Sequence, residues 1–362
     1  MRLPEGRQGL PRAEEGLRVR NTRFLDACRR QPVDATPVWI MRQAGRYLPQ
    51  YRATREKAGD FLTLCKTPEL ACEVTLQPLD ILGVDAAILF SDILIPVQAM
   101  GIPLRFEEGE GPKLAAVRSA DEIKRLHVPD PVAETGFVLE AVRLIRRELA
   151  GRVPLIGFSG APFTLASYVV EGGTSRDFRN VLTWMYADPQ GFAVLLELLA
   201  DTVLAYCDAQ VEAGVQAIQL FDTWAGVLSR RQYREFALPY TRRVVSRLQR
   251  HGVPLILYVK GCSAFLEEMA LTGVDVISVD WRVSLAEASE RTRGAVALQG
   301  NLDPMALYAS RDAVERETAK VLADAPPLGH VFNLGHGIQP DTPVQNAQAL
   351  VEIVHRLGRK EI

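Results

Sequence analysis

The sequence has few cysteines and no long apolar run. Its 362 residues include five cysteines, an odd number, and no two of them form a C-x-x-C pair. This argues against a disulfide framework and a paired-cysteine zinc site, and favours inert thiols in a reducing compartment. The longest apolar stretch, AVLLELLADTVLAY, is interrupted by Glu197 and Asp201. The charged N-terminus lacks a signal-peptide core, so we expect a soluble, cytoplasmic protein that does not bind a membrane.

The sequence also lacks an excess of charge of either sign and lacks the common ligand-binding motifs. The 42 Lys and Arg residues nearly balance the 44 Asp and Glu residues, which leaves a net charge of −2. This balance argues against a nucleic-acid partner. We find no H-E-x-x-H, H-x-H or clustered carboxylate motif, no P-loop, and no G-x-G-x-x-G after a strand. We therefore expect no metal site and no nucleotide site of these types.

What is present is a repeated alternation of strand-like and helix-like segments. Most of the strand-like runs are continuously apolar, as expected for parallel strands covered on both faces. Segments with helical spacing separate them, for example 68–82, 189–213, 231–250, 262–271, 305–322 and 343–357, and 95–115 resembles a hairpin-bearing loop. There are eight strand-like runs, at 37–42, 85–90, 153–158, 217–222, 254–260, 275–280, 295–300 and 331–336.

Eight such units predict an α/β fold, a single (β/α)8 barrel of the TIM type with its active-site cleft at the C-terminal strand ends. A doubly wound sheet is the alternative. We assign the barrel to residues 21–362 and expect residues 1–20 to form a mobile arm. Polar residues follow the apolar runs at the predicted cleft: Arg42, Asp92, Ser159, Asp222, Thr223, Lys260, Asp280, Asn301 and His336.

An arginine-rich segment, MRQAGRYLPQYRATR, follows the first run. Residues 38–55 contain no acid, and Gly45 and Pro49 indicate a loop over 41–55. Guanidinium groups bind carboxylates through paired hydrogen bonds, so the segment predicts a site for several carboxylates or phosphates. The alternative is a solvated basic loop. The arginines are Arg42, Arg46, Arg52 and Arg55, of which Arg52 is the weakest candidate.

Three further residues stand at predicted strand ends or helix starts. Asp92, in LFSDIL, suits a general base, a metal ligand or a fixed anion opposite a cationic intermediate; the alternative is a helix cap. Tyr168 follows GFSGAPFTLAS about two turns into a predicted helix, and is either a cleft residue or a packed aromatic. Of the five histidines, His336 alone falls on the catalytic face, where Gly335 and Gly337 allow a close approach to a ligand.

These segments resemble the uroporphyrinogen decarboxylase family. PVWIMRQAGRYLPQYR (37–52) and GFSGAPFTLASYVVEGG (157–173) are similar to its two signatures, and FSDIL, QLFDTWAG and NLGHGIQPD are similar to further family blocks. The resemblance covers residues 21–358. It implies a homodimeric, cofactor-free barrel enzyme, a carboxy-lyase of haem and porphyrin biosynthesis. Such an enzyme removes CO₂ from the four acetate side chains of uroporphyrinogen III and forms coproporphyrinogen III.

The resemblance also implies the site. Asp92 resembles the invariant acid that faces the pyrrole N–H groups and is the candidate catalytic residue. A threonine at position 223 keeps the hydroxyl that a serine would supply there. The residues implied to bind substrate are Arg42, Gln43, Ala44, Gly45, Arg46, Arg55, Asp92, Tyr168, Thr223 and His336. The identity of the proton donor stays open between an arginine, water and Asp92.

Two other functions are compatible with parts of this pattern. A related barrel methyltransferase would use a zinc-bound thiolate with His-x-Cys spacing, but here the comparable residues are Lys260, Gly261 and Cys262. A non-catalytic tetrapyrrole carrier would need the arginine segment but not Asp92. The presence of Asp92 together with Tyr168 and His336 favours the enzyme.

Overall fold

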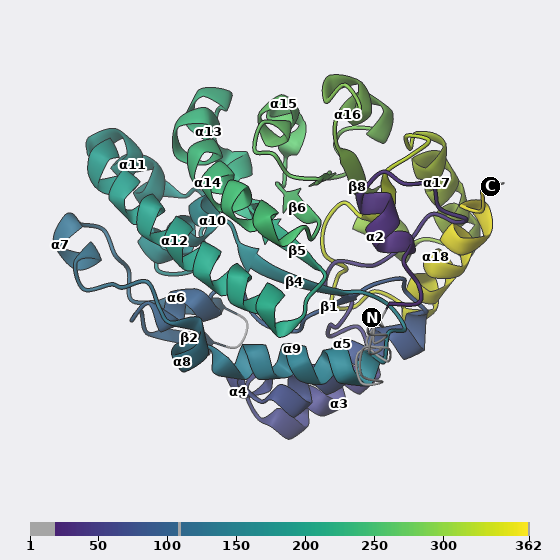
Figure 1. Ribbon diagram of the computed structural model, residues 1–362, viewed down its shortest axis with the longest axis horizontal. Coiled ribbons are helices and arrows are strands. Elements are labelled where there is room, and N and C mark those ends of the chain that lie inside the picture. The colour runs from purple at the N-terminus through teal and green to yellow at the C-terminus, as the bar shows by residue number, and fades with distance from the viewer. Residues whose placement is uncertain (1–18, 108–109, 361–362) are drawn as a thin grey trace, which may run out of the picture.

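The computed structural model describes residues 19–107 and 110–360, so the arm predicted for 1–20 lies almost wholly outside the described residues. A parallel sheet forms the centre, and helices cover its outside (Figure 1). Its seven strands are neighbours in chain order, β1-β4-β5-β6-β7-β8-β9, which rules out the order reversal of a doubly wound sheet. The strands are β1 (Ala87–Ile88), β4 (Leu155–Gly160), β5 (Ala217–Phe221), β6 (Leu255–Tyr258), β7 (Val276–Ser278), β8 (Ala297–Leu302) and β9 (His330–Leu334).

The two ends of this sheet are joined by the segment 37–41, which completes the barrel. Phe332 of β9 donates its N–H to the Pro37 carbonyl, and Trp39 donates to the Phe332 carbonyl. On the other side, Asp85 donates its N–H to the Val38 carbonyl, just before β1. The predicted barrel is confirmed, with 37–41 occupying the place of its eighth strand.

The prediction of a regular strand at 37–42 is wrong, because this segment forms only one bridge, Val38 with Phe332. Side chains take the N–H groups that a ladder would use. Asp85 accepts from Val38 N at 2.8 Å, Gln43 accepts from Ile40 N at 3.1 Å, and Asn333 accepts from Met41 N at 2.9 Å. The chain therefore follows the sheet edge without forming a continuous ladder.

Helices follow the predicted positions closely where proline marks the first turn. The predicted helices 68–82 and 189–213 coincide with α5 and α12. The predicted 231–250 is divided before Pro239, and 305–322 begins later because Pro304–Tyr308 is a 3-10 turn. The α-helices are α2 (Arg23–Cys28), α3 (Pro49–Ala58), α4 (Phe61–Lys66), α5 (Pro68–Leu82), α6 (Ile95–Ala99), α7 (Ala120–Ile123), α8 (Pro131–Glu134), α9 (Gly136–Leu149), α10 (Pro162–Glu171), α11 (Arg179–Ala187), α12 (Pro189–Ala213), α13 (Arg230–Phe236), α14 (Leu238–Leu248), α15 (Leu266–Ala270), α16 (Leu285–Arg291), α17 (Arg311–Ala323) and α18 (Val344–Leu357). The 3-10 turns are η1 (Thr223–Val227), η2 (Gln249–His251), η3 (Cys262–Ala264) and η4 (Pro304–Tyr308).

Two connections near the barrel mouth differ in how well the sequence predicts them. The hairpin expected within 95–115 is confirmed: β2 (Leu104–Glu107) pairs antiparallel with β3 (Gly111–Leu114). The prediction of a loop over 41–55 is wrong in its second half, because helix α3 begins at Pro49. Proline fits the first helical position because its fixed φ suits a helix and its missing N–H is not needed there.

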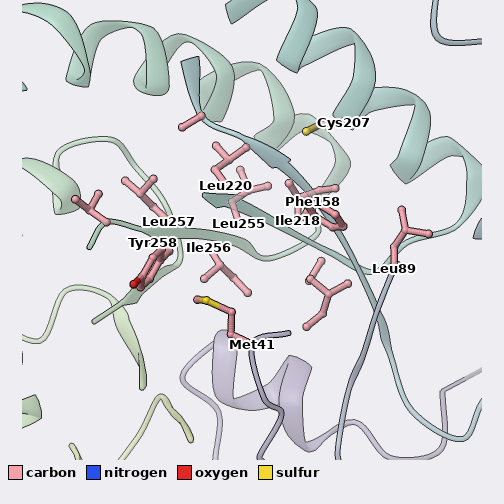
Figure 2. Close-up of a cluster of buried hydrophobic side chains, with 14 of the residues drawn as sticks. Met41, Leu89, Phe158, Cys207, Ile218, Leu220, Leu255, Ile256, Leu257 and Tyr258 are labelled. Atoms are coloured by element: carbon pink, nitrogen blue, oxygen red, sulfur yellow. The ribbon is translucent and has the colours of Figure 1, made fainter. Parts of the chain in front are cut away.

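The barrel interior is filled by side chains, so it is a packed core and not a channel. Figure 2 shows part of this core, including Met41, Phe158, Ile218 and Tyr258. A buried polar chain also crosses it, in which Trp39 donates to Gln299 at 2.9 Å and Gln299 donates to Gln219 at 3.1 Å. These hydrogen bonds satisfy the Gln299 amide, which would otherwise be costly to bury.

Candidate active site

The predicted site residues lie beyond the C-terminal ends of the strands. Asp92 follows β1, Thr223 follows β5, and His336 follows β9. Arg42 is electrostatically coupled to Asp92, Tyr168 and His336, and it lowers the pKa of each of these groups. The structure therefore brings these residues together around the Arg42 guanidinium at one end of the barrel.

Arg42 is exposed and has a φ of 66°, a left-handed conformation that non-glycine residues rarely adopt. The preceding residue, Met41, is anchored by Asn333, and the following residue, Gln43, is anchored to the sheet. The Arg42 stem lies against Gly337, where an added Cβ would stand 2.8 Å from Arg42 Cγ. Glycine at 337 thus leaves the space that the arginine occupies.

The other arginines divide into two kinds. Arg52 donates to the carbonyls of Arg46, at 2.7 Å, and Tyr47, at 3.3 Å, and so holds the turn before α3. Arg42, Arg46 and Arg55 form no ion pair with any residue in 19–107 and 110–360. Three guanidinium groups are thereby left for an external anion.

The residues between Arg42 and Arg46 shape the turn. Gln43 is fully buried, accepts from Ile40 N and donates to the Ala86 carbonyl, so its side chain is occupied by the backbone. Ala44 is half-buried against the core. A Cβ at Gly45 would lie 2.8 Å from the Arg42 carbonyl oxygen, so glycine permits the tight turn. Gln43 and Gly45 thus support the turn between the arginines, and substrate binding by Gln43, Ala44 and Gly45 stays a prediction.

Asp92 stands at the mouth in a poorly solvated position. Desolvation raises the pKa of its carboxyl to about 6, although a hydrogen bond from Leu94 N and the charge of Arg42 oppose the rise. Leu94 N donates to Asp92 Oδ1 at 2.8 Å. The next helix, α6, has Leu94 as its N-cap residue, and no side chain forms a capping hydrogen bond there. Asp92 is therefore not the N-cap of that helix. Near neutral pH most of the carboxylate is therefore ionised, and the charge of Arg42 acts on it.

Aromatic and hydroxyl groups form another wall. Tyr168, on α10, is half-buried, and burial raises the pKa of its phenol. Its ring meets the Trp224 ring edge-on, with centroids 5.9 Å apart. Thr223 begins η1, directly after the buried Asp222, whose Oδ1 accepts from Thr164 N at 3.1 Å and Thr164 Oγ1 at 2.8 Å. Tyr168 and Thr223 are therefore held by neighbouring elements at the same rim.

His336 has a partner that sequence reasoning missed. The Tyr258 hydroxyl lies 2.9 Å from His336 Nδ1 and 3.1 Å from the Gly335 carbonyl, and the two rings are stacked. Burial, with Arg42, Lys260 and Arg282 nearby, lowers the pKa of His336 to about 3. The ring is therefore neutral at physiological pH. The only sequence signal for Tyr258 was a hydroxyl-bearing aromatic at the end of the apolar run PLILYVK.

The remaining histidines make their contacts outside this site. His330 begins β9, at the opposite end of the strand from His336, and its Nε2–H donates to the Gly300 carbonyl at 3.0 Å. The others pair with acids: His127 with Glu134, His251 with Asp208 and His355 with Asp85. All five cysteines are free and buried, as predicted. Within residues 19–107 and 110–360, no three His, Cys, Asp or Glu side chains gather in a way that suits a metal ion.

Fold and site together define a class. This is an α/β barrel enzyme whose mouth combines arginines that have no ion-pair partner among the described residues with the poorly solvated carboxylate of Asp92, an arrangement suited to a substrate with several carboxylates. In the part of the chain that the structure describes, no helix has the length and apolarity needed to cross a membrane.

Comparison with known proteins identifies the family. The family model described as uroporphyrinogen decarboxylase (URO-D) matches residues 19–357. The uroporphyrinogen decarboxylase of Pectobacterium atrosepticum is 54% identical over 347 residues, which cover 94% of this chain and 98% of that protein. The enzyme of Nitrosococcus oceani is 55% identical over 346 residues, with 94% and 97% covered. The chain belongs to the uroporphyrinogen decarboxylase family and is a carboxy-lyase.

Solved structures support the same fold. A methyltransferase from Methanosarcina mazei superposes with a TM-score of 0.80 at 23% identity, covering 94% of this chain and 99% of that one. A vitamin-B12-independent methionine synthase from Listeria monocytogenes gives a TM-score of 0.57 at 13% identity, with 90% and 98% covered. At these identities the likeness shows the barrel fold alone.

Proposed function

We propose that the chain decarboxylates the four acetate side chains of uroporphyrinogen III, which gives coproporphyrinogen III. One observation carries this proposal. Three arginines that have no ion-pair partner among the described residues occur together with the poorly solvated carboxylate of Asp92. Arg42, Arg46 and Arg55 bind substrate carboxylates. Asp92, in its ionised form, faces the pyrrole N–H groups.

The reaction needs an electron sink for the pair released when the C–CO₂ bond breaks, and a cofactor usually supplies one. A pyrrole serves as its own sink once a proton is added to a ring carbon. The bonding pair then moves toward the cationic ring, CO₂ leaves, and the side-chain carbon takes up a proton and becomes a methyl group. The ring carbon gives up the proton that was added at the start, which restores the neutral pyrrole. The net change replaces one carboxylate by one hydrogen at the cost of one proton.

Asp92 contributes at the step of the reaction in which the pyrrole ring is positively charged. A fixed carboxylate near the protonated pyrrole stabilises the positive charge as it develops, and the low local polarity strengthens the effect. Although burial raises the pKa of Asp92 to about 6, most of the carboxylate stays ionised at neutral pH. His336 is neutral and therefore acts as a hydrogen-bonding contact for the substrate. Tyr168 and Thr223 supply hydroxyl contacts.

The proposal includes the wider expectations of a homodimer, a cytoplasmic location and a reaction without cofactor or metal. Multi-angle light scattering tests the first, since a dimer has twice the mass of the 40.0-kDa chain. The methyltransferase alternative would need Cys262 as a zinc thiolate. Burial raises the pKa of that thiol to about 12, and a lysine stands where a histidine ligand would be.

The decisive experiment is anaerobic incubation with reduced uroporphyrinogen III in the presence of a chelator, followed by chromatography of the oxidised porphyrins. We expect a series of products with seven, six, five and four carboxylates, as stepwise loss of four acetate carboxyls requires. An Asp92→Asn variant, of nearly the same size, is the matched control and should bind but not convert substrate. Recovery of only the eight-carboxylate porphyrin from folded wild-type protein would contradict the proposal and favour a carrier.

A further inference from the structure

Lys260 lies two residues after the end of β6 and is half-buried. β6 ends at Tyr258, and Lys260 lies in the turn that follows the C-terminal end of this strand. The Tyr258 side chain points to the mouth, where its hydroxyl meets His336. The intervening Val259 is fully buried, whereas Lys260 is partly exposed. Lys260 therefore extends toward the same end of the barrel as His336.

The place of Lys260 in the ring sets it across the mouth from Arg42. Counting from the segment 37–41, the strands follow in the order β1, β4, β5, β6, β7, β8 and β9. Arg42 follows the first member of this ring and Lys260 the fifth. In a ring of eight, these positions face each other. The two cations thus stand on opposite walls of one cleft.

The backbone at Lys260 is held firmly by its neighbours. A Cβ at Gly226 would collide with the Lys260 carbonyl oxygen, so η1 is packed directly against this residue. On the other side, Gly261 N donates to Asp280 Oδ2 at 2.7 Å. Positions on rigid supports direct a side chain more accurately than positions on free loops.

The charge of Lys260 is not neutralised within the described part of the chain. Its ammonium forms no hydrogen bond or ion pair there, whereas the neighbouring Arg282 is paired. Arg282, four residues beyond β7, binds Asp280 at 2.6 Å and stacks on Trp281. The positive charge of Lys260 also helps to lower the pKa of His336, which agrees with its place in the cleft.

We propose that Lys260 is a further substrate-binding residue, which takes a peripheral carboxylate of the tetrapyrrole on the wall opposite the arginine segment 42–55. This inference rests on the proposed function. An octacarboxylate macrocycle carries its charges around its whole rim, so arginines on one side leave the far carboxylates without a partner. Lys260 binds one of them and fixes how the disc lies across the mouth.

The test compares Lys260→Met with Lys260→Arg, which keeps the charge, and with Lys320→Met. Lys320 is an exposed lysine on α17 paired with Glu317 and serves as the matched control. Binding is measured by quenching of tryptophan fluorescence with uroporphyrin, the oxidised octacarboxylate, which is not turned over. Turnover of uroporphyrinogen supplies KM and kcat in parallel.

We expect Lys260→Met to weaken uroporphyrin binding and raise KM by about tenfold or more, as loss of a charge-assisted contact implies, with a much smaller change in kcat. Lys260→Arg should remain within a few-fold of wild type, and Lys320→Met should match it. Binding by Lys260→Met within twofold of wild type at low salt would overturn the proposal. If Lys260→Met does not fold, Lys260→Gln replaces it under the same criteria. Wild-type protein that fails to decarboxylate would instead overturn the proposed function, because the porphyrin-binding readout does not depend on turnover.

Discussion

The side chain of Arg42 lies directly over Gly337, and any larger residue at 337 would occupy its space: an added Cβ would stand 2.9 Å from Arg42 Nε. The two residues come from opposite ends of the chain, after the first and the last member of the barrel ring. Arg42 is exposed and has no ion-pair partner among the described residues. The aliphatic part of its side chain occupies the space that a side chain at position 337 would otherwise fill. Its direction is set before substrate binds.

Replacing Gly337 by alanine should therefore displace Arg42 without unfolding the barrel. Gly337 has no positive φ in the structure, so the methyl group acts through space and not through backbone strain. We expect KM for uroporphyrinogen to rise by about tenfold, the cost of weakening one charge-assisted contact. Gly136→Ala, at a helical position with open space around the glycine, is the control and should leave KM unchanged. An unaltered KM in Gly337→Ala would place Arg42 outside the binding site.

Asp92 predicts the acid limb of the pH profile. Its pKa is raised to about 6, and the ionised form is the one that stabilises a cationic pyrrole. As pH falls through about 6, Asp92 takes up a proton and kcat/KM should fall with it. The limb should disappear in Asp92→Asn, which has low activity at every pH. A wild-type profile that stays flat down to about pH 5 would exclude an essential carboxylate with this pKa.

The same residue predicts a gain in stability on mutation. Because the pKa of Asp92 is higher in the folded protein than its ordinary value of 3.8, the folded state binds the proton more tightly. The ionised carboxylate therefore opposes folding above about pH 6, and this cost vanishes below about pH 4. Asp92→Asn should raise the free energy of unfolding at pH 8 by about 1–3 kcal/mol and have little effect at pH 4. Urea unfolding at both pH values measures the difference, and a loss of stability at pH 8 would contradict the assigned pKa.

His336 is expected to stay neutral throughout the working pH range. Burial and three neighbouring cations lower its pKa to about 3, so its ring resonances should not move between about pH 5 and pH 8. Tyr258→Phe removes the hydroxyl that lies 2.9 Å from Nδ1 and should reduce kcat/KM several-fold by loosening the ring. Nuclear magnetic resonance of labelled histidine checks the first point. Titration of His336 near its ordinary value would mean that the ring is more solvated than the structure indicates.

Barrel closure depends on Asp85, which accepts hydrogen bonds from Val38 N, Asn21 Nδ2 and His355 Nε2, at 2.8, 2.9 and 2.8 Å. Asp85→Ala leaves these groups without their acceptor in a buried place, so we expect a loss of about 2–4 kcal/mol in the free energy of unfolding. Asp80→Ala removes an exposed acid paired with Arg152 and should cost less than about 1 kcal/mol. Equal losses in the two variants would show that closure does not depend on Asp85.

The sequence by itself determined the parts of this protein whose signals are local. Seven of the eight predicted runs contain a strand, because continuous apolar residues identify a buried parallel strand wherever it lies. Proline at the first turn identified the starts of α5 and α12. The position of Arg42, Asp92 and His336 at the mouth also followed from the strand ends, because all parallel strands of a barrel finish at the same rim.

Tertiary structure alone decided how these parts meet. The segment 37–41 is not a regular strand because Asp85 and Asn333, distant in sequence, take its N–H groups. The pKa of Asp92 depends on how completely surrounding elements exclude water, which no local pattern reports. The contact between Tyr258 and His336 joins residues 78 positions apart. Such contacts have no period or spacing in the sequence, so they are set only when the ring closes and its opposite walls come into register.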